Sequence, residues 1–191
     1  IVNLYLENAR SIVDWMHAGF NSIFIVLLYA GIALSLTYIA LSVFSSRYTG
    51  RDDDPLQDEE APTVAVHIPT MNELAALDCA EHCLESDYPD DKLRVIIGDD
   101  SDNEDKAERI AAFGEKHERV NVIPREENEG YKPGNLNNML DQTESELVCV
   151  FDSDFKPGPS FIRRLVTPLA RDDTIHATQG RWEPFNPDQN Y

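Results

Sequence analysis

The stretch LVCVFDSDFKPG (residues 147–158) places an apolar run directly before two aspartates. Consecutive apolar residues are typical of a strand that is buried in a parallel sheet. Asp152 and Asp154 follow where this strand should end, and residues i and i+2 of an extended chain lie on the same face. The pair therefore predicts one of three features: a metal site, a nucleophile with its helper, or a turn.

The same strand pattern occurs three times upstream of this stretch. The apolar runs cover residues 64–69, 93–100 and 120–124, and the segments between the four runs have helical spacing at residues 72–86, 102–117 and 134–142. This alternation predicts an α/β fold with a Rossmann-like, mostly parallel sheet and helices on both faces. Ligands bind such sheets outside the carboxyl ends of the strands.

Polar residues gather at these predicted strand ends. Asp99 and Asp100 end the second run, and the loop NEGYKPGN (residues 128–135) brings Lys132 and Gly134 to the start of a helix. Carboxylate oxygens suit Mg²⁺ or Mn²⁺, which take further ligands from phosphates, and a lysine beside a helix N-terminus suits a phosphate. We therefore expect a metal-bridged diphosphate, although each motif alone is also typical of a cap, a turn or a surface loop.

The N-terminal part of the chain has a different composition. Residues 23–44 contain no charged side chain, and about 20 apolar residues suffice to cross a bilayer as a helix. We interpret them as a transmembrane helix in preference to a signal peptide or a buried core helix. Residues 1–22 are then a juxtamembrane or interfacial segment, residues 45–62 an acidic linker, and residues 63–191 the α/β domain.

Charge and cysteine content indicate which partners are excluded and in which compartment the domain lies. The formal net charge of −19 repels nucleic-acid phosphates, so we exclude DNA and RNA as partners. Arg47 and Arg51 follow the apolar run whereas only Arg10 precedes it, which favours a domain on the cytoplasmic side of the plasma membrane. Three cysteines agree with a reducing compartment.

Five blocks resemble a known family in their order and spacing. They are PTMNE, GDDSDNED, NEGYKPGNLN, FDSDFKPGPSFI and TQGRW, within residues 69–182. Together they resemble the family 2 glycosyltransferases with a GT-A fold, and above all the membrane-bound branch related to cellulose synthase. The chain looks like an N-terminal fragment of such an enzyme. Met71 and Lys156 depart from the common pattern, which has an aromatic and an apolar residue at these positions.

The resemblance implies roles for individual residues. The donor-binding positions that it implies are Thr70, Glu73, Asp99, Asp100, Lys132, Gly134, Asn137 and Asp152. One of the paired acids Asp99 and Asp100 would contact uracil and ribose, and Lys132 would lie near the diphosphate.

The resemblance also implies a metal pair and an acceptor side. Asp152 and Asp154 match the family's Asp-x-Asp motif, which binds Mg²⁺ or Mn²⁺ between the two phosphates of the donor. Gln179, Arg181 and Trp182 match a block near the sugar and the acceptor.

The reaction that the resemblance implies is inverting glycosyl transfer. A nucleotide sugar, expected to be a UDP-sugar, would donate to a saccharide or lipid-linked acceptor at a lipid membrane, which would extend a polysaccharide or glycolipid. No residue matches the family's catalytic base, which we expect beyond Tyr191. The chain is therefore expected to bind the donor but to turn it over poorly.

Three other interpretations stay open at this point. A non-catalytic, membrane-tethered module that binds nucleotide sugars would share the same motifs. A nucleotidyltransferase would release pyrophosphate instead of a nucleoside diphosphate. A phosphatase of the Asp-x-Asp type is less favoured, because Lys156 stands where that class usually has threonine or valine.

Overall fold

The computed structural model describes residues 2–47 and 53–180 and divides the chain into two units, residues 1–52 and 53–191. The first unit is one helix, α1 (Val2–Arg47), without a break near residue 22. Residues Arg10–Arg47 form a segment that is long and apolar enough to cross a membrane. The most apolar stretch of 18 residues within it is not buried inside the protein. The hydroxyls of Ser22, Ser35 and Thr37 donate to carbonyls four residues earlier, so the helix itself satisfies these polar groups.

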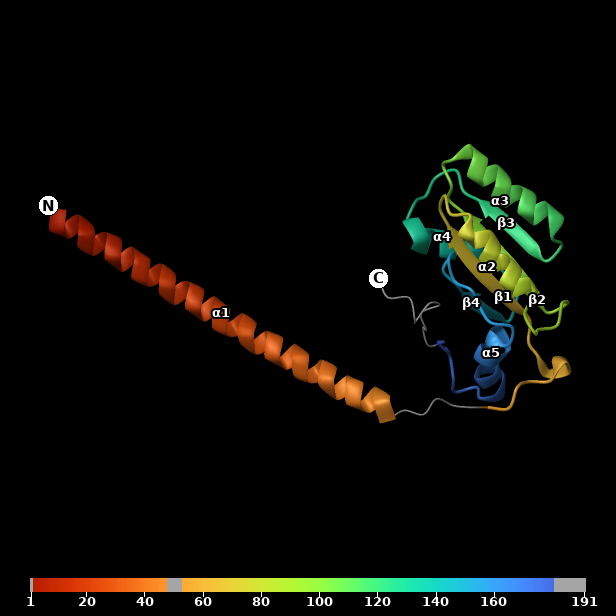
Figure 1. Cartoon of the computed structure of the whole chain (residues 1–191), viewed down its shortest axis with the longest axis horizontal. Coiled ribbons are helices and arrows are strands. Elements are labelled where there is room, and N and C mark those ends of the chain that lie inside the picture. The colour runs from red at the N-terminus through yellow and green to blue at the C-terminus, as the bar shows by residue number, and fades with distance from the viewer. Residues whose placement is uncertain (1, 48–52, 181–191) are drawn as a thin grey trace, which may run out of the picture. The chain divides into compact units, whose positions relative to one another are not determined.

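The second unit is built on a parallel four-stranded sheet (Figure 1). Its strands are β1 (Val64–Thr70), β2 (Leu93–Asp99), β3 (Val120–Pro124) and β4 (Leu147–Val150), in the order β3-β2-β1-β4. All four coincide with predicted runs. Every residue of β1 is buried, as expected of a central strand that is covered on both faces.

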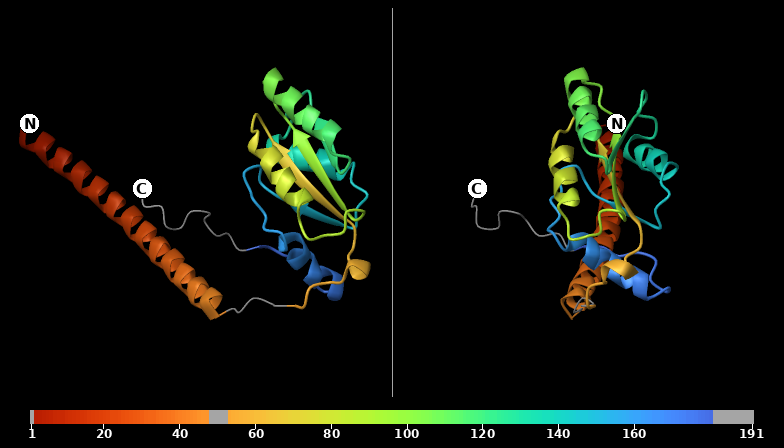
Figure 2. Two further views of the ribbon diagram at one scale, coloured as in Figure 1. Left: turned by 45° about the vertical axis from the view of Figure 1, so that its right-hand side comes forward. Right: turned by 90° about the vertical axis from the view of Figure 1, so that its right-hand side faces the viewer.

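Helices cover both faces of this sheet, which confirms the predicted fold class (Figure 2). Helices α2 (Ala75–Leu84) and α3 (Glu104–Lys116) lie on one face, and α4 (Tyr131–Leu140) lies on the other. Alternate residues of β1 follow this division, since Val64, Val66 and Ile68 join the larger core with α2. Ala65 instead packs with Met139 of α4 in a smaller core.

A last helix, α5 (Phe161–Arg171), was not predicted from the sequence. It contains Pro168, which lacks the N–H that would continue the helical hydrogen bonds. A proline within a sequence pattern therefore predicts the end of a helix. Ile162 and Val166 of α5 are buried in the larger core. This packing maintains the helix in spite of the proline.

The stretch expected to be an acidic linker is partly packed on the domain. Leu56 and Ala61 are buried, and η1 (Asp58–Glu60) is a single 3₁₀ turn between them. Arg163 of α5 donates to the carbonyl of Leu56 at 2.7 Å and to the carboxylate of Asp58 at 2.7 Å. These bonds attach the segment that precedes β1 to the domain.

Candidate functional site

A cavity of about 440 Å³ opens at the carboxyl ends of the strands. It lies there because the strands are parallel and in register, with Thr70 of β1 beside Asp99 of β2, so that the loops after them converge. Its lining residues are Pro69, Thr70, Met71, Glu73, Asp100, Asn128, Tyr131, Lys132, Asn135, Asp152, Ser153 and Asp154.

The Asp-x-Asp pair lies on the cavity wall. β4 ends at Val150, the Phe151 N–H donates to the His67 carbonyl at 3.0 Å, and the chain then turns. Asp152 and Asp154 both line the cavity, and among the described residues the carboxylate of Asp154 makes no hydrogen bond or ion pair. At least one carboxylate of the pair is therefore open to a ligand.

Lys132 reaches the same wall from the start of α4. Its ammonium forms an ion pair with the carboxylate of Asp152. Two glycines shape this loop. Gly130 has a φ of 70°, and a Cβ at Gly134 would lie 2.0 Å from the carbonyl oxygen of Glu129. The close backbone approach that brings Lys132 to the cavity thus requires glycine at position 134.

The turn after β1 supplies Thr70 and Glu73. The Thr70 hydroxyl donates to the Glu73 carbonyl at 3.1 Å, and the Ser153 hydroxyl donates to the Glu73 carboxylate. Asn72 between them has a left-handed backbone, with a φ of 58°, and its side chain donates to Asp102 at 2.7 Å. Glu73 is therefore linked directly to the middle residue of the Asp-x-Asp motif.

The two paired acids have different surroundings. Asp99 is buried and accepts the N–H of Ser101 at 3.0 Å, and it does not line the cavity. Asp100 does line it, and both of its carboxylate oxygens accept hydrogen bonds from Arg125 at 2.7 and 2.6 Å. This pairing with the carboxylate raises the pKa of Arg125, so the guanidinium stays charged.

Arg125 and Asn135 are site residues that the sequence reasoning missed. Arg125 follows β3 directly, in the same relation to its strand as Asp100 has to β2, and this position was the available signal. Asn135 is buried, lines the cavity and donates from Nδ2 to the Gly98 carbonyl at 2.9 Å. The predicted Asn137 is exposed and does not line the cavity.

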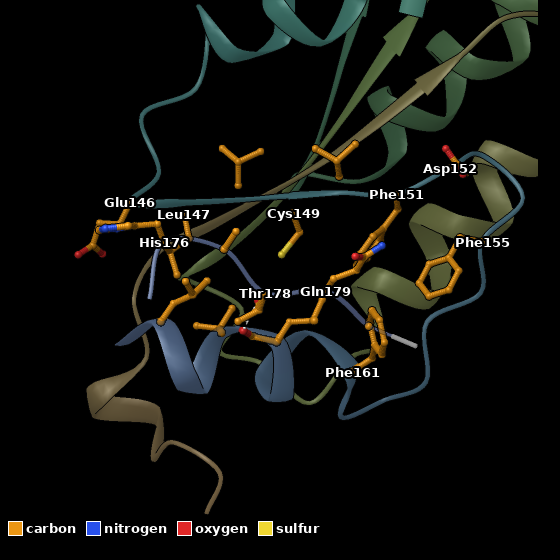
Figure 3. Close-up of a pocket in the computed structure, with 17 residues that line it drawn as sticks. Glu146, Leu147, Cys149, Phe151, Asp152, Phe155, Phe161, His176, Thr178 and Gln179 are labelled. Carbon is orange, nitrogen blue, oxygen red and sulfur yellow. Dashed lines mark hydrogen bonds between the residues drawn. The ribbon is translucent and has the colours of Figure 1, made fainter. Parts of the chain in front are cut away.

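The predicted acceptor-side residues lie elsewhere. Gln179 lines a second cavity, of about 410 Å³, between β4, α5 and the segment around Thr178 (Figure 3). The Thr178 hydroxyl donates to the Leu165 carbonyl at 2.8 Å and so holds this segment on α5. Asp152 lines both cavities. Arg181 and Trp182 lie outside the described residues.

The charges on the first cavity suit a divalent cation. Four carboxylates line it, from Glu73, Asp100, Asp152 and Asp154. They face Lys132 on the wall and Arg125 behind Asp100. Among the residues in 2–47 and 53–180, no three histidine, cysteine or acidic side chains are grouped to hold a metal alone. Asp152 and Asp154 would thus supply part of a coordination shell, which phosphates and waters would complete.

Known proteins resemble this chain over the α/β domain. The sequence profile of "Glycosyl transferase family 2" matches residues 65–191. Glucomannan 4-beta-mannosyltransferase 1 of Oryza sativa subsp. japonica is 35% identical over 148 residues, which are 72% of this chain and 28% of that protein. The UDP-forming cellulose synthase catalytic subunit of Pseudomonas fluorescens (strain SBW25) is 36% identical over 134 residues, which are 69% of this chain and 18% of that protein.

A solved structure supports the same relation. A mannosyltransferase from Pyrobaculum calidifontis, in complex with GDP-Man and Mn²⁺, aligns with a TM-score of 0.63 and 26% identity. The alignment covers 79% of this chain and 44% of that one. The chain spans less than a third of the length of the two curated relatives.

Proposed function

Because this chain belongs to glycosyltransferase family 2, in its cellulose-synthase-like branch, we propose that its cavity binds a nucleotide-sugar donor for glycosyl transfer. One observation carries the proposal. Asp152, Asp154 and Lys132 line a single cavity beside Asp100, at the end of a parallel sheet where ligands of this architecture bind. That arrangement offers carboxylates to a metal, and a cation to a diphosphate.

Each part of the donor has a suitable partner in the cavity. A divalent ion on Asp152 and Asp154 would stabilise the negative charge that develops on the departing diphosphate. Lys132 adds a positive charge next to Asp152, where the diphosphate would lie. Asp100 keeps free lone pairs for N–H or O–H groups of the nucleoside, since Arg125 occupies one site on each of its oxygens.

Three other predicted donor residues, Thr70, Asp99 and Gly134, shape the loops around the cavity in this proposal. Thr70 fixes the turn that carries Glu73, and Asp99 fixes the start of the loop after β2. Gly134 permits the loop geometry that places Lys132. We assign no general base within the described residues, and Gln179 remains a candidate for the acceptor side.

The reaction we propose is inverting transfer from a nucleoside diphosphate sugar to a saccharide or lipid-linked acceptor at a membrane. Helix α1 would anchor the chain, and Arg47 at its C-terminal end favours a cytoplasmic domain. The name of the Pseudomonas relative supports a UDP-sugar, whereas the Pyrobaculum structure holds GDP-Man. A test of the donor therefore includes both bases.

The test is isothermal titration of the full chain in detergent with UDP and with GDP, each with MnCl₂ or with EDTA. We expect one nucleotide to bind in the presence of Mn²⁺. We expect that EDTA, Asp152→Ala or Asp154→Ala lowers the affinity at least about tenfold, because the divalent ion that would link the carboxylates to the diphosphate is then absent or weakly held. Asp141→Ala, which removes an exposed carboxylate outside the cavity, is the matched control. Equal affinity with EDTA and with Mn²⁺ would refute the metal-bridged site.

A further inference from the structure

Arg125 lies between Asp100 and the loop that carries Lys132, which are two parts of the proposed donor site. It directly follows β3, and its backbone N–H donates to the Asp99 carbonyl at 2.9 Å, which continues the pairing of β3 with β2 by one residue. The sheet thus fixes the start of this side chain. Only 12% of the side chain is exposed, which limits its freedom further.

The guanidinium of Arg125 joins two segments that are far apart in the sequence. On one side it donates to both carboxylate oxygens of Asp100. On the other side it donates to the carbonyl of Glu129 at 3.0 Å and to that of Tyr131 at 3.2 Å. Lys132 follows Tyr131 directly, so one planar group holds the nucleoside-facing acid and the backbone next to the diphosphate-facing lysine.

The local packing adds to this constraint. The Gly134 N–H donates to the Gly130 carbonyl at 3.0 Å, and a Cβ at Gly134 would lie 3.1 Å from Nη1 of Arg125. The loop is therefore folded tightly around the guanidinium. Lysine could supply the charge of arginine here but not its fork of donors in fixed directions.

We propose that Arg125 is a positioning residue that sets the spacing between Asp100 and Lys132, and with it the fit of a nucleoside diphosphate. This inference rests on the proposed function. It predicts that Arg125 matters most for a ligand that must reach both ends of the cavity. Inorganic pyrophosphate reaches only the metal and lysine end, and it can recentre there when the loop shifts.

The chain contains a matched control at the other end of the same strand. Arg119 directly precedes β3, forms an ion pair with Asp90 at 2.8 Å and donates to the Leu84 carbonyl at 3.0 Å. Arg119 therefore resembles Arg125 in the kind of contacts it makes, but its partners Asp90 and Leu84 do not line the donor cavity, whereas Asp100, the partner of Arg125, does. Arg119→Lys reports the general cost of losing a partly buried guanidinium.

The experiment compares the full chain in detergent with Arg125→Lys, Arg125→Ala and Arg119→Lys. Isothermal titrations measure the affinity for UDP and GDP with Mn²⁺ and for pyrophosphate with Mn²⁺, and thermal unfolding gives Tm. We expect both Arg125 variants to lose about 10- to 100-fold in affinity for the nucleotide that binds, because Asp100 and Lys132 are then no longer held in one geometry that fits both ends of the ligand. The affinity for pyrophosphate should fall less than about threefold, and Arg119→Lys should leave both affinities unchanged.

The outcomes separate this inference from the proposed function. Parental affinity in Arg125→Lys would show that charge alone suffices, and it would overturn the positioning role. An equal fall for nucleotide and pyrophosphate, in step with Tm, would overturn it in favour of a general structural role. If the parent binds a nucleotide in an Asp152-dependent way while the Arg125 variants keep the parental ratio of affinities, only this inference fails. If the parent binds neither UDP nor GDP, the proposed function fails as well.

Discussion

His67 is a buried titratable residue in the middle of β1. Its Nε2 lies 2.8 Å from the Thr143 hydroxyl oxygen. The only hydrogen of that hydroxyl is donated to the Met139 carbonyl. Nε2 therefore carries a hydrogen and donates it to the Thr143 hydroxyl. Burial lowers the pKa of His67, because the charged form loses its hydration.

This pKa shift makes stability depend on pH. Since the folded-state pKa lies below the unfolded value of about 6.5, the unfolded chain binds more protons in the interval between them. The contribution of His67 is thus complete above pH 6.5 and declines as pH falls toward the folded-state pKa. We expect a lower urea midpoint at pH 5.5 than at pH 7.5, measured by circular dichroism. His67→Gln should reduce this difference, whereas the exposed control His176→Gln should keep it.

At this scale the sequence predicted that Asp152, Asp154 and Lys132 lie together at the strand ends. All three line one cavity, as the topology of a parallel sheet explains, and their roles stay predictions. It failed for Arg125 and Asn135, whose partners lie 25 and 37 residues away. The position of Arg125 directly after β3 indicates that it lies at the strand ends, but the local pattern of neither residue specifies its partner.

At the scale of elements, α5 and the segment before β1 depend on each other through Arg163. This buried side chain donates to the carbonyls of Leu56 and Asp87 and to the carboxylate of Asp58, and its guanidinium lies 5.7 Å from the centre of the Tyr88 ring. Burial lowers the pKa of Arg163, but Asp58 and Asp87 together raise it by more, so the guanidinium stays charged.

Removing the Arg163 clamp, which is the set of hydrogen bonds from Arg163 to Leu56, Asp58 and Asp87, should destabilise the domain. We expect Arg163→Met to lower the free energy of unfolding by about 2–4 kcal/mol, since the buried carbonyl of Leu56 and the partly buried carbonyl of Asp87 lose a charged donor. The same variant should expose residues 53–62 to proteolysis. Arg164→Met, which changes an exposed neighbour on α5, should shift stability by less than about 0.5 kcal/mol. Similar urea midpoints and cleavage rates in both variants would contradict the clamp.

Element prediction was accurate where hydrophobic period and end signals agree. The predicted helical segment at residues 102–117 contains α3, and Asn103 caps this helix by accepting the Lys106 N–H at 3.1 Å. Helix α4 begins at Tyr131, although the predicted start lay three residues later. Its first turn follows Gly130 in a left-handed conformation, a geometry that the hydrophobic pattern does not encode.

At the scale of the whole molecule, the net charge of −19 works against folding. Like charges repel more strongly in the compact state than in the extended chain, and salt screens this repulsion. We expect the Tm of the full chain to rise between about 0.05 and 0.5 M KCl and then to level off, as the Debye length falls to a few ångströms. A Tm that stays constant or falls over this range would contradict the expectation, and NaCl should reproduce the effect of KCl.

The α/β architecture was predictable as a whole, because four apolar runs alternating with amphipathic segments leave few other folds. The continuity of α1 was harder to predict from the sequence. Residues 10–22 carry charged and polar side chains and lack a clean helical period, yet they continue the same helix as the apolar run. A helix can extend through such a stretch once its costly first turns are formed elsewhere.

The position of Asp152 on the walls of both cavities has a thermodynamic consequence. A ligand that contacts this carboxylate from one cavity changes the electrostatic environment that it presents to the other. Linkage then requires reciprocity: if occupancy of the second cavity changes the donor's affinity by some factor, the donor changes the second ligand's affinity by that same factor. The affinity measured for a ligand of one cavity therefore depends on whether the other cavity is occupied. The order in which the two ligands are added does not change the fractions of free and bound protein at equilibrium.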